Sequence, residues 1–193
     1  MAASATLLVL AGGRSRRMGR SKALLPVEGT TLVEWITQRL GPGFEELLVA
    51  AGEAAQLPAG LRARLVEDRR PGAGPLAGIE AGLAAAGHQT VLAVACDMPY
   101  LTLAAARTLA AAAEGHDAAV PRPGGRPEPA CAAYRRSALT AISAALDEGL
   151  HKASDALSAL DVSWLEDLEP ALFMSLNTPE DYRAFLASLA KTR

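Results

Sequence analysis

A segment near the start of the chain combines residue types that bind polyphosphates. Gly12 and Gly13 follow a short apolar run, and glycines without a Cβ let a ligand approach the backbone N–H groups closely. The side chains that follow add positive charge to such a site. These cationic residues are Arg14, Arg16, Arg17 and Lys22. Because the chain has only three lysines, a lysine at the end of this loop is distinctive. The segment is predicted to bind an anion.

This loop has three alternative interpretations. Ala23 follows Lys22, so the loop does not match G-x-x-x-x-G-K-[ST], which disfavours a P-loop NTPase. It also lacks the spacing G-x-G-x-x-G of a dinucleotide-binding fingerprint. A solvated basic turn that binds nothing is the third alternative.

A carboxylate follows a second apolar run. Asp97 comes directly after residues 91–95, which are predicted to form a buried strand, and it precedes Met98 and Pro99. In open parallel sheets, ligands bind at the carboxyl ends of the strands. The Asp97 carboxylate is therefore expected at that edge. The alternative is that Asp97 only forms a turn before Pro99.

Strands that alternate with helical patterns must position these residues. The pattern predicts an α/β fold: a single three-layer domain spanning residues 1–193, with a mostly parallel sheet and helices on both faces. The predicted strands are residues 7–10, 44–51, 61–66, 90–95, 118–121, 129–134 and 173–176. The predicted helices are residues 32–40, one that ends near 86, one between Thr102 and Gly115, 137–146, 154–160 and one that begins at Thr178-Pro179.

Composition excludes several classes of protein. The net charge of −2 provides no basic excess for general nucleic-acid binding. Cys96 and Cys131 have neither C-x-x-C spacing nor the number expected of a disulfide framework, and both are predicted to be buried, non-nucleophilic residues. No apolar run is long enough to span a membrane, and residues 1–13 lack the basic start of a signal peptide. We expect a cytoplasmic protein that binds neither nucleic acid nor membrane.

Four ordered motifs resemble those of one enzyme family. They are L-A-G-G-x-S-x-R-M-G-x-x-K from Leu10, G-P-L-x-G from Gly74, D-x-P from Asp97 and N-T-P-E-D from Asn177. Together they resemble the molybdenum cofactor guanylyltransferases, within the nucleotidyltransferase superfamily. The resemblance implies a Rossmann-like nucleotidyltransferase fold that transfers GMP from GTP to the phosphate of molybdopterin and releases pyrophosphate. Mg²⁺ is implied as the cofactor, and transient contact with other molybdenum cofactor biosynthesis or acceptor proteins is expected.

The resemblance also implies roles for individual residues. Catalysis is assigned to Lys22, Arg17 and Asp97. Metal binding is assigned to Asp97 and Asn177, and contact with the second substrate to Asn177 and Arg126. Arg122 and Arg135 are further candidates for the molybdopterin phosphate. Nucleotide binding is assigned to Leu10, Ala11, Gly12, Gly13, Arg14, Lys22, Asp68, Gly74, Pro75 and Leu76. For Asn177, the alternative is an Asx turn before a helix capped by Thr178.

Guanine is the expected base. A carboxylate beside the G-P-L-x-G motif can accept hydrogen bonds from guanine N1–H and the exocyclic amine. Asp68 is the first candidate for that role, and Glu67 is the second.

The sequence departs from the family pattern in two places. Ser21 replaces the usual Asp before the lysine, and an asparagine common after the second strand is absent from the stretch 49–52. The rival functions are a molybdopterin cytidylyltransferase and a non-catalytic nucleotide-binding module. Cytidylyltransferases usually carry a G-D-x-G-A-R-like stretch where this chain reads Asp147-Glu148-Gly149-Leu150-His151-Lys152, which favours guanine.

Overall fold

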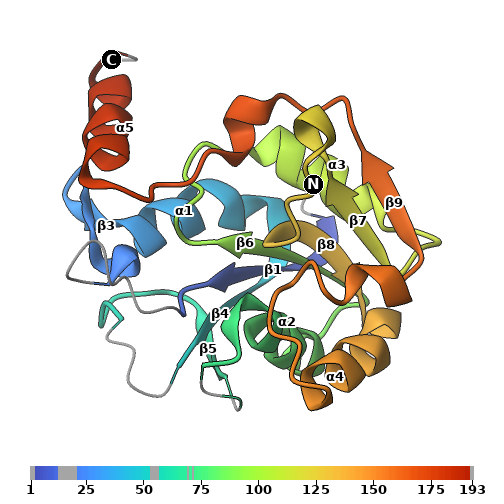
Figure 1. Ribbon diagram of the computed structural model, residues 1–193. Coiled ribbons are helices and arrows are strands. Elements are labelled where there is room, and N and C mark those ends of the chain that lie inside the picture. The colour runs from blue at the N-terminus through green and yellow to red at the C-terminus, as the bar shows by residue number, and fades with distance from the viewer. Residues whose placement is uncertain (1–2, 13–20, 53–56, 69, 71, 192–193) are drawn as a thin grey trace.

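A twisted sheet of seven strands forms the centre of the computed structural model, which describes residues 3–12, 21–52, 57–68, 70 and 72–191 (Figure 1). The strand order is β5-β4-β1-β6-β8-β7-β9, and β8 runs antiparallel to both of its neighbours. The strands are β1 (Ala3–Leu10), β4 (Phe44–Ala51), β5 (Arg64–Glu67), β6 (Thr90–Ala95), β7 (Ala118–Pro121), β8 (Cys131–Arg135) and β9 (Val162–Leu165). The predicted mostly parallel sheet is confirmed.

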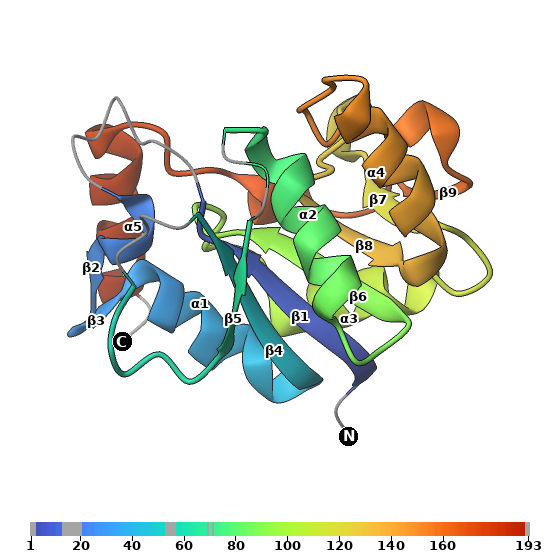
Figure 2. The same ribbon diagram turned by 90° about the horizontal axis from the view of Figure 1, so that it is seen from below.

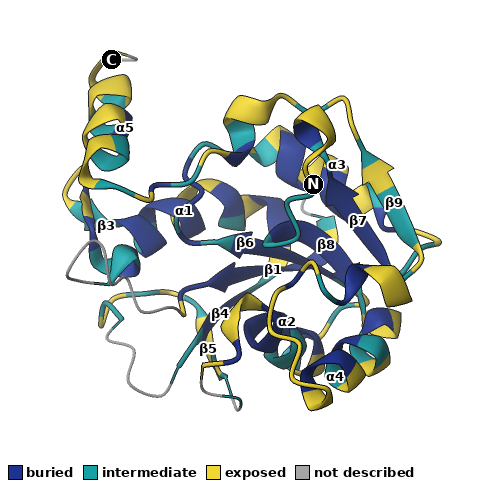
Figure 3. Ribbon diagram, viewed as in Figure 1, coloured by how far each residue is buried: buried dark blue, intermediate teal, exposed yellow. Residues whose placement is uncertain are grey.

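Helices cover both faces of this sheet. The helices are α1 (Leu32–Leu40), α2 (Gly74–Ala85), α3 (Leu103–Ala112), α4 (Leu139–Asp147) and α5 (Pro179–Lys191). Alternate residues of β1 face opposite sides, so Leu7 and Val9 join one buried cluster and Leu8 and Leu10 the other. The first cluster contains residues of α1 and α3, and the second contains residues of α2 and α4, which lie in front of the sheet in Figure 2. The central strands β1, β6, β7 and β8 are mostly buried between these two layers, whereas β5 and β9 at the edges of the sheet are partly exposed (Figure 3).

Local sequence signals explain where several helices begin. Thr31 caps α1, because its backbone N–H donates to Glu34 Oε2 at 2.9 Å and its hydroxyl accepts from the Glu34 N–H at 3.5 Å. A hairpin of β2 (Pro26–Val27) and β3 (Thr30–Thr31) leads into this helix. Thr102 caps α3 by accepting from the Ala105 N–H at 3.2 Å. Both helices were predicted, one over residues 32–40 and one between Thr102 and Gly115.

Small residues let α2 pack closely on the sheet. A Cβ on Gly78 would lie 3.0 Å from Leu10 Cδ2, and a Cβ on Gly82 would collide with Leu8 Cδ2. The N-terminal end of the helix therefore comes close to the end of β1, where the glycine loop begins. This packing positions Gly74 and Pro75 next to the edge of the sheet.

The structure corrects three predicted elements. The predicted strand 173–176 is wrong: the chain forms a 3₁₀ turn, η6 (Pro170–Phe173), and then an unpaired extended segment. Its apolar residues Phe173 and Leu176 are buried in the core cluster that contains residues of α1 and α3, although neither belongs to a strand. The predicted helix 154–160 is reduced to the 3₁₀ turn η5 (Leu157–Ala159). Strand β9 was missed because its alternating, partly exposed residues give a weak signal at the edge of a sheet.

Helix α5 is attached to the domain by aromatic contacts. The Phe185 ring makes edge contacts with Trp35 and Tyr100, with ring centroids 5.2 and 5.4 Å apart. Tyr182 donates a hydrogen bond to the backbone oxygen of Pro26. The C-terminal helix therefore packs beside the segment that follows Lys22. Within the described ranges, none of the helices is long and apolar enough to cross a membrane.

Candidate active site

Three polar side chains from distant parts of the chain meet at the carboxyl edge of the sheet. Lys22 Nζ donates to Asp97 Oδ2 at 2.7 Å and to Asn177 Oδ1 at 2.9 Å. The side chains of Lys22 and Asp97 are 18% and 21% exposed, so the ion pair lies in a partly desolvated place that a ligand can still reach. The structure thus brings together three residues that the sequence singled out separately.

Backbone hydrogen bonds fix Asp97 at this edge. The Cys96 N–H donates to Leu10 O at 3.1 Å, which attaches the end of β6 to the end of β1. The Asp97 carbonyl accepts from the Leu176 N–H at 2.8 Å, and this bond brings Asn177 to the same place. The extended segment before α5 therefore serves to place Asn177.

Asp181 holds the backbone around Asn177. Its Oδ2 accepts from the N–H groups of Asn177 at 2.9 Å and Thr178 at 2.8 Å. The Thr178 hydroxyl accepts in return from the Asp181 N–H at 3.1 Å, which completes a cap at the start of α5. These hydrogen bonds, chiefly that from the Thr178 N–H, lower the pKa of Asp181. The predicted cap by Thr178 is therefore present, and the Asn177 side chain accepts from Lys22.

The oxygen donors of Asp97 and Asn177 are compatible with a magnesium ion. Both contact the same cationic group, the Lys22 ammonium, which shows that they converge on a position suited to positive charge. Mg²⁺ in nucleotide sites is typically held by one or two protein oxygens, with phosphate oxygens and water completing the shell. In the described part of the chain, no cluster of three or more His, Cys, Asp or Glu side chains could hold a metal alone.

The beginning of the glycine loop lies beside these residues. The side chains of Leu10 and Ala11 are buried, so neither is available to a ligand. The backbone N–H of Ala11 is also occupied, because it donates to Ala50 O at 2.8 Å. Gly12 is exposed, and a Cβ there would come no nearer than 4.0 Å to its surroundings. The predicted site residues that lie outside the described part of the chain are Gly13, Arg14, Arg16 and Arg17.

The start of α2 forms another part of this edge. Gly74 has a φ of +68°, and a Cβ there would lie 2.8 Å from His151 O, so glycine is required. Pro75 is exposed in the first turn, whereas the Leu76 side chain is fully buried in the core. Asp68 directly follows β5, and its N–H donates to Ala51 O at 3.2 Å. The predicted base-reading carboxylate therefore lies at the carboxyl end of its strand.

The three arginines suggested for the pterin side lie in different places. Arg126 is exposed in the segment between β7 and β8, at the same edge of the sheet as Asp97. Arg122 is occupied by an ion pair with Glu166 and by stacking over Trp164, with its guanidinium carbon 4.9 Å from the ring centroid. Among these three arginines, Arg126 is at the same edge of the sheet as Asp97. Burial raises the pKa of the nearby Glu128 carboxyl, and the charge of Arg126 partly opposes this larger effect.

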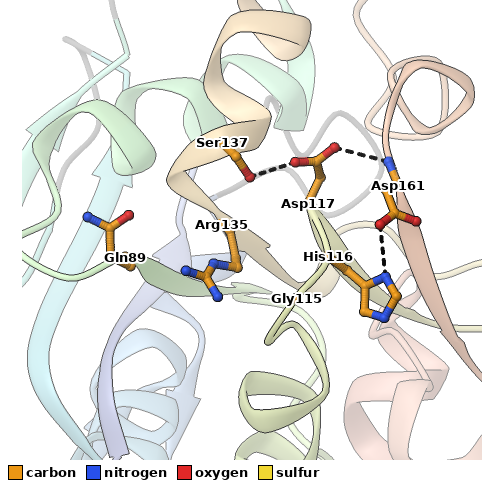
Figure 4. A pocket seen from close by; sticks show the side chains of 7 residues that line it. All are labelled: Gln89, Gly115, His116, Asp117, Arg135, Ser137 and Asp161. Carbon is orange, nitrogen blue, oxygen red and sulfur yellow. Dashed lines mark hydrogen bonds and ion pairs between the residues drawn. The ribbon is translucent and has the colours of Figure 1, made fainter.

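Arg135 lies at the opposite edge of the sheet, so the expectation that it contacts the second substrate is wrong. It pairs with Thr90 at the amino end of β6. It lines a separate pocket of about 420 Å³, shown in Figure 4. There Asp117 accepts from the Ser137 hydroxyl at 2.6 Å and from the Asp161 N–H at 3.0 Å. The sequence could not exclude Arg135, because the antiparallel direction of β8 decides its position.

Neither cysteine fits a nucleophile. Both thiols are buried and unbonded to one another. Burial raises the pKa of Cys96 to about 12, so its thiol is protonated at neutral pH. Burial also raises the pKa of Cys131. No covalent intermediate on sulfur is expected from this pair.

Asp181→Ala is expected to lower the melting temperature by a few degrees and to weaken binding of magnesium-linked GTP, because it releases the backbone of Asn177. Since its folded-state pKa lies below the ordinary value, the stability from Asp181 is present at neutral pH and lost as the pH falls through that lowered pKa. The melting temperatures of the wild type and Asp181→Ala should therefore converge as the pH is lowered.

Glu180→Ala is the matched control for this variant. Glu180 is an exposed acid in the same helical turn and pairs with Arg183 rather than with Asn177. The Glu180→Ala variant should bind GTP as the wild type does. Equal binding losses in both variants would contradict a role for Asp181 in positioning Asn177.

Comparisons with known proteins identify the family of the chain. A family model described as a MobA-like NTP transferase domain matches residues 7–167. A probable molybdenum cofactor guanylyltransferase of Pelotomaculum thermopropionicum is 39% identical over 186 residues, covering 92% of this chain and 89% of the relative. A molybdenum cofactor guanylyltransferase of Cereibacter sphaeroides is 37% identical over 179 residues, covering 90% of this chain and 91% of the relative.

Solved structures have the same fold. Molybdopterin-guanine dinucleotide biosynthesis protein A from Archaeoglobus fulgidus aligns with a TM-score of 0.85 at 29% identity, covering 96% of this chain and 99% of that one. A 2-C-methyl-D-erythritol 4-phosphate cytidylyltransferase from Thermus thermophilus, at 24% identity and a TM-score of 0.74, covers 98% and 100% and shares the fold. The resemblance to the molybdenum cofactor guanylyltransferases is confirmed, and the chain belongs to the MobA-like NTP transferase family as a relative of these enzymes.

Proposed function

We propose that this protein transfers GMP from GTP to the phosphate of molybdopterin, releasing pyrophosphate and forming the guanine dinucleotide cofactor. The observation that carries the proposal is the contact of Lys22 with both Asp97 and Asn177. It assembles a cation, a carboxylate and a neutral oxygen donor beside a glycine loop, and such a set suits a triphosphate. The names of the relatives at 37–39% identity supply the substrate class.

The proposed reaction is a single in-line displacement. An oxygen of the pterin phosphate attacks the α-phosphorus of GTP, a new P–O bond forms, and the bond to the oxygen that bridges the α- and β-phosphorus atoms breaks. The electron pair of the broken bond leaves with pyrophosphate. Catalysis then depends on positioning and on stabilising the charge of the phosphoryl oxygens.

Lys22 is the residue proposed to stabilise that charge. Its ammonium lies at the edge of the sheet where Gly12 opens the loop, and it would exchange its contacts with Asp97 and Asn177 for phosphate oxygens. Asp97 and Asn177 would then be free to hold Mg²⁺, which when bound would neutralise charge on the triphosphate. Arg17 is proposed to assist Lys22, and Arg126 and Asn177 to face the second substrate.

The finer assignments are also proposals. Magnesium dependence rests on the donor set of Asp97 and Asn177. A cytoplasmic location is supported by the two free thiols. Transient contact with proteins that deliver molybdopterin or accept the product would follow from handing over a cofactor.

The test is a pyrophosphate-release assay of the full chain with molybdopterin and magnesium, with GTP, CTP and ATP in parallel and in competition. GTP should be used preferentially. Equal or better use of CTP would assign the protein to the cytidylyltransferases. Binding of nucleotide without any pyrophosphate release would favour a non-catalytic binding module.

Base choice is proposed to depend on Asp68. Replacing Asp68 with Asn should lower the preference for GTP over ATP by about tenfold or more, because the amide can no longer accept from two guanine donors at once. The rate at saturating GTP should change less than this preference. Competition between the two nucleotides measures the effect.

Glu67→Gln is the matched control, because Glu67 is the adjacent, exposed carboxylate at the end of β5. It should leave the preference for GTP unchanged. A loss of preference in Glu67→Gln alone would transfer the base-reading role to Glu67.

A further inference from the structure

Arg70 links the segment that carries Asp68 to two helices. Its Nε donates to Glu80 Oε2 at 3.0 Å and its Nη2 to Glu80 Oε1 at 3.2 Å, so the contact with α2 is bidentate. Its Nη1 donates to Asp147 Oδ1 at 2.7 Å, at the end of α4. The Ser143 hydroxyl of α4 donates to Glu80 Oε1 at 2.7 Å. One guanidinium therefore joins the segment after β5 to both helices on this face of the sheet.

The backbone of Arg70 contacts the base-reading candidate itself. The Arg70 N–H donates to Asp68 Oδ1 at 2.9 Å. The Arg70 carbonyl accepts from the Ala73 N–H at 3.0 Å, directly before the first residue of α2. The position of the Arg70 backbone thus fixes the rotation of the Asp68 carboxylate. The side chain of Arg70 in turn fixes that backbone.

This network has the geometry in which an ion pair can position a segment. Isolated surface pairs contribute little to stability, whereas a bidentate arginine in a network holds a defined orientation. The Arg70 side chain is 33% exposed and the Glu80 side chain 17%, so water competes only partly for their contact. A lysine could not make three hydrogen bonds in this planar arrangement.

We propose that Arg70 is a positioning residue for guanine selection, acting through the orientation of the Asp68 carboxylate. The inference rests on the proposed function, in which Asp68 reads the base. Hydrogen bonds weaken steeply as their angles depart from linearity, so a carboxylate that rotates freely would discriminate poorly between guanine and adenine. Glu80 and Asp147 share the role because they hold the guanidinium.

Calorimetric titration of the full chain with GTP and with ATP tests this inference, beside thermal melts of the same samples. Arg70→Ala should lower the ratio of GTP affinity to ATP affinity by about tenfold, the size expected from losing one well-aligned hydrogen bond. Asp147→Ala keeps the bidentate contact with Glu80 and should cause a smaller loss. The affinity ratio of Arg70→Lys should lie between those of Arg70→Ala and the wild type.

Arg64→Ala is the matched control. Arg64 also pairs with a glutamate, with Nη2 at 2.7 Å from Glu46 Oε1, but it begins β5 at the end opposite Asp68. It removes the same charge and one ion pair and should leave the affinity ratio unchanged. A purely structural role for Arg70 would lower the melting temperature or weaken both nucleotides equally, and an unchanged ratio would overturn the inference.

Asp68→Asn separates failure of this inference from failure of the proposed function. If Asp68→Asn lowers the ratio and Arg70→Ala does not, Arg70 is not the positioning residue while Asp68 remains the base reader. If neither variant changes the ratio, the base-reading role of Asp68 fails, and the inference about Arg70 fails with it. If the affinity ratio falls in both Asp68→Asn and Arg70→Ala and is unchanged in Arg64→Ala, the result supports the inference about Arg70.

Discussion

Lys22→Ala should remove most turnover and leave the fold intact. In the described part of the chain, Lys22 Nζ donates to both Asp97 Oδ2 and Asn177 Oδ1, at 2.7 and 2.9 Å. Losing a preorganised donor beside a transferring phosphoryl group should lower kcat by about 100-fold or more. The melting temperature should change little, because a partly exposed ion pair contributes little to stability. Pyrophosphate release at saturating GTP, measured on the folded variant, gives the result.

Two further variants make this result interpretable. Lys191→Ala removes a lysine from the exposed end of α5 and should leave kcat unchanged. Lys22→Arg keeps the charge but replaces a compact ammonium with a wider planar group, so it should recover only part of the rate. Wild-type kinetics in Lys22→Ala would exclude the assigned role.

Asp97→Asn should remove most of the effect of magnesium on GTP binding. The substitution keeps an oxygen at the end of β6 but removes the negative charge that a divalent cation requires. The gain in GTP affinity on adding Mg²⁺ should fall by about tenfold or more, as in other sites that lose a group holding a metal. Calorimetric titrations with and without Mg²⁺ measure this gain directly.

Asp161→Asn is the control for the loss of an aspartate charge. Asp161 also contacts a basic side chain, with its Oδ2 3.0 Å from His116 Nδ1 (Figure 4). It precedes β9, at the edge of the sheet opposite Asp97. The gain in GTP affinity on adding Mg²⁺ should be the same in Asp161→Asn as in the wild type. If Asp97→Asn kept the full magnesium effect as well, Asp97 would be a turn residue before Pro99.

Most of the fold could be predicted because its signals are local. The strands β1, β4 and β6 contain the apolar runs 7–10, 47–51 and 91–95, and the starts of α1 and α3 carry capping residues next to their first turns. The errors lie where apolar residues are buried outside regular structure. Phe173 and Leu176 resemble strand residues in sequence, but they are buried in the core without joining the sheet, and the Leu176 N–H donates to the Asp97 carbonyl.

The site was only partly predictable for a similar reason. Lys22, Asp97 and Asn177 were each marked by a local motif, but Arg70 was not, since it belongs to none of the four motifs. Its partners Glu80 and Asp147 lie on two different helices, and only the packing of α2 beside α4 brings them to one guanidinium. Arg135 shows the reverse case, a plausible cation that the direction of β8 removes from the site.

By itself, the sequence determined the class of fold, the glycine loop and the identities of the three polar residues at the candidate site. These are properties of short segments, in which residue type and spacing set the local backbone and the chemistry of the side chains. Only the tertiary structure decided that Lys22 contacts Asp97 and Asn177, that Arg70 holds the segment of Asp68, and that Arg135 lies elsewhere. Contacts between distant residues depend on strand order, strand direction and helix packing, which arise from burial of the whole core rather than from any one segment.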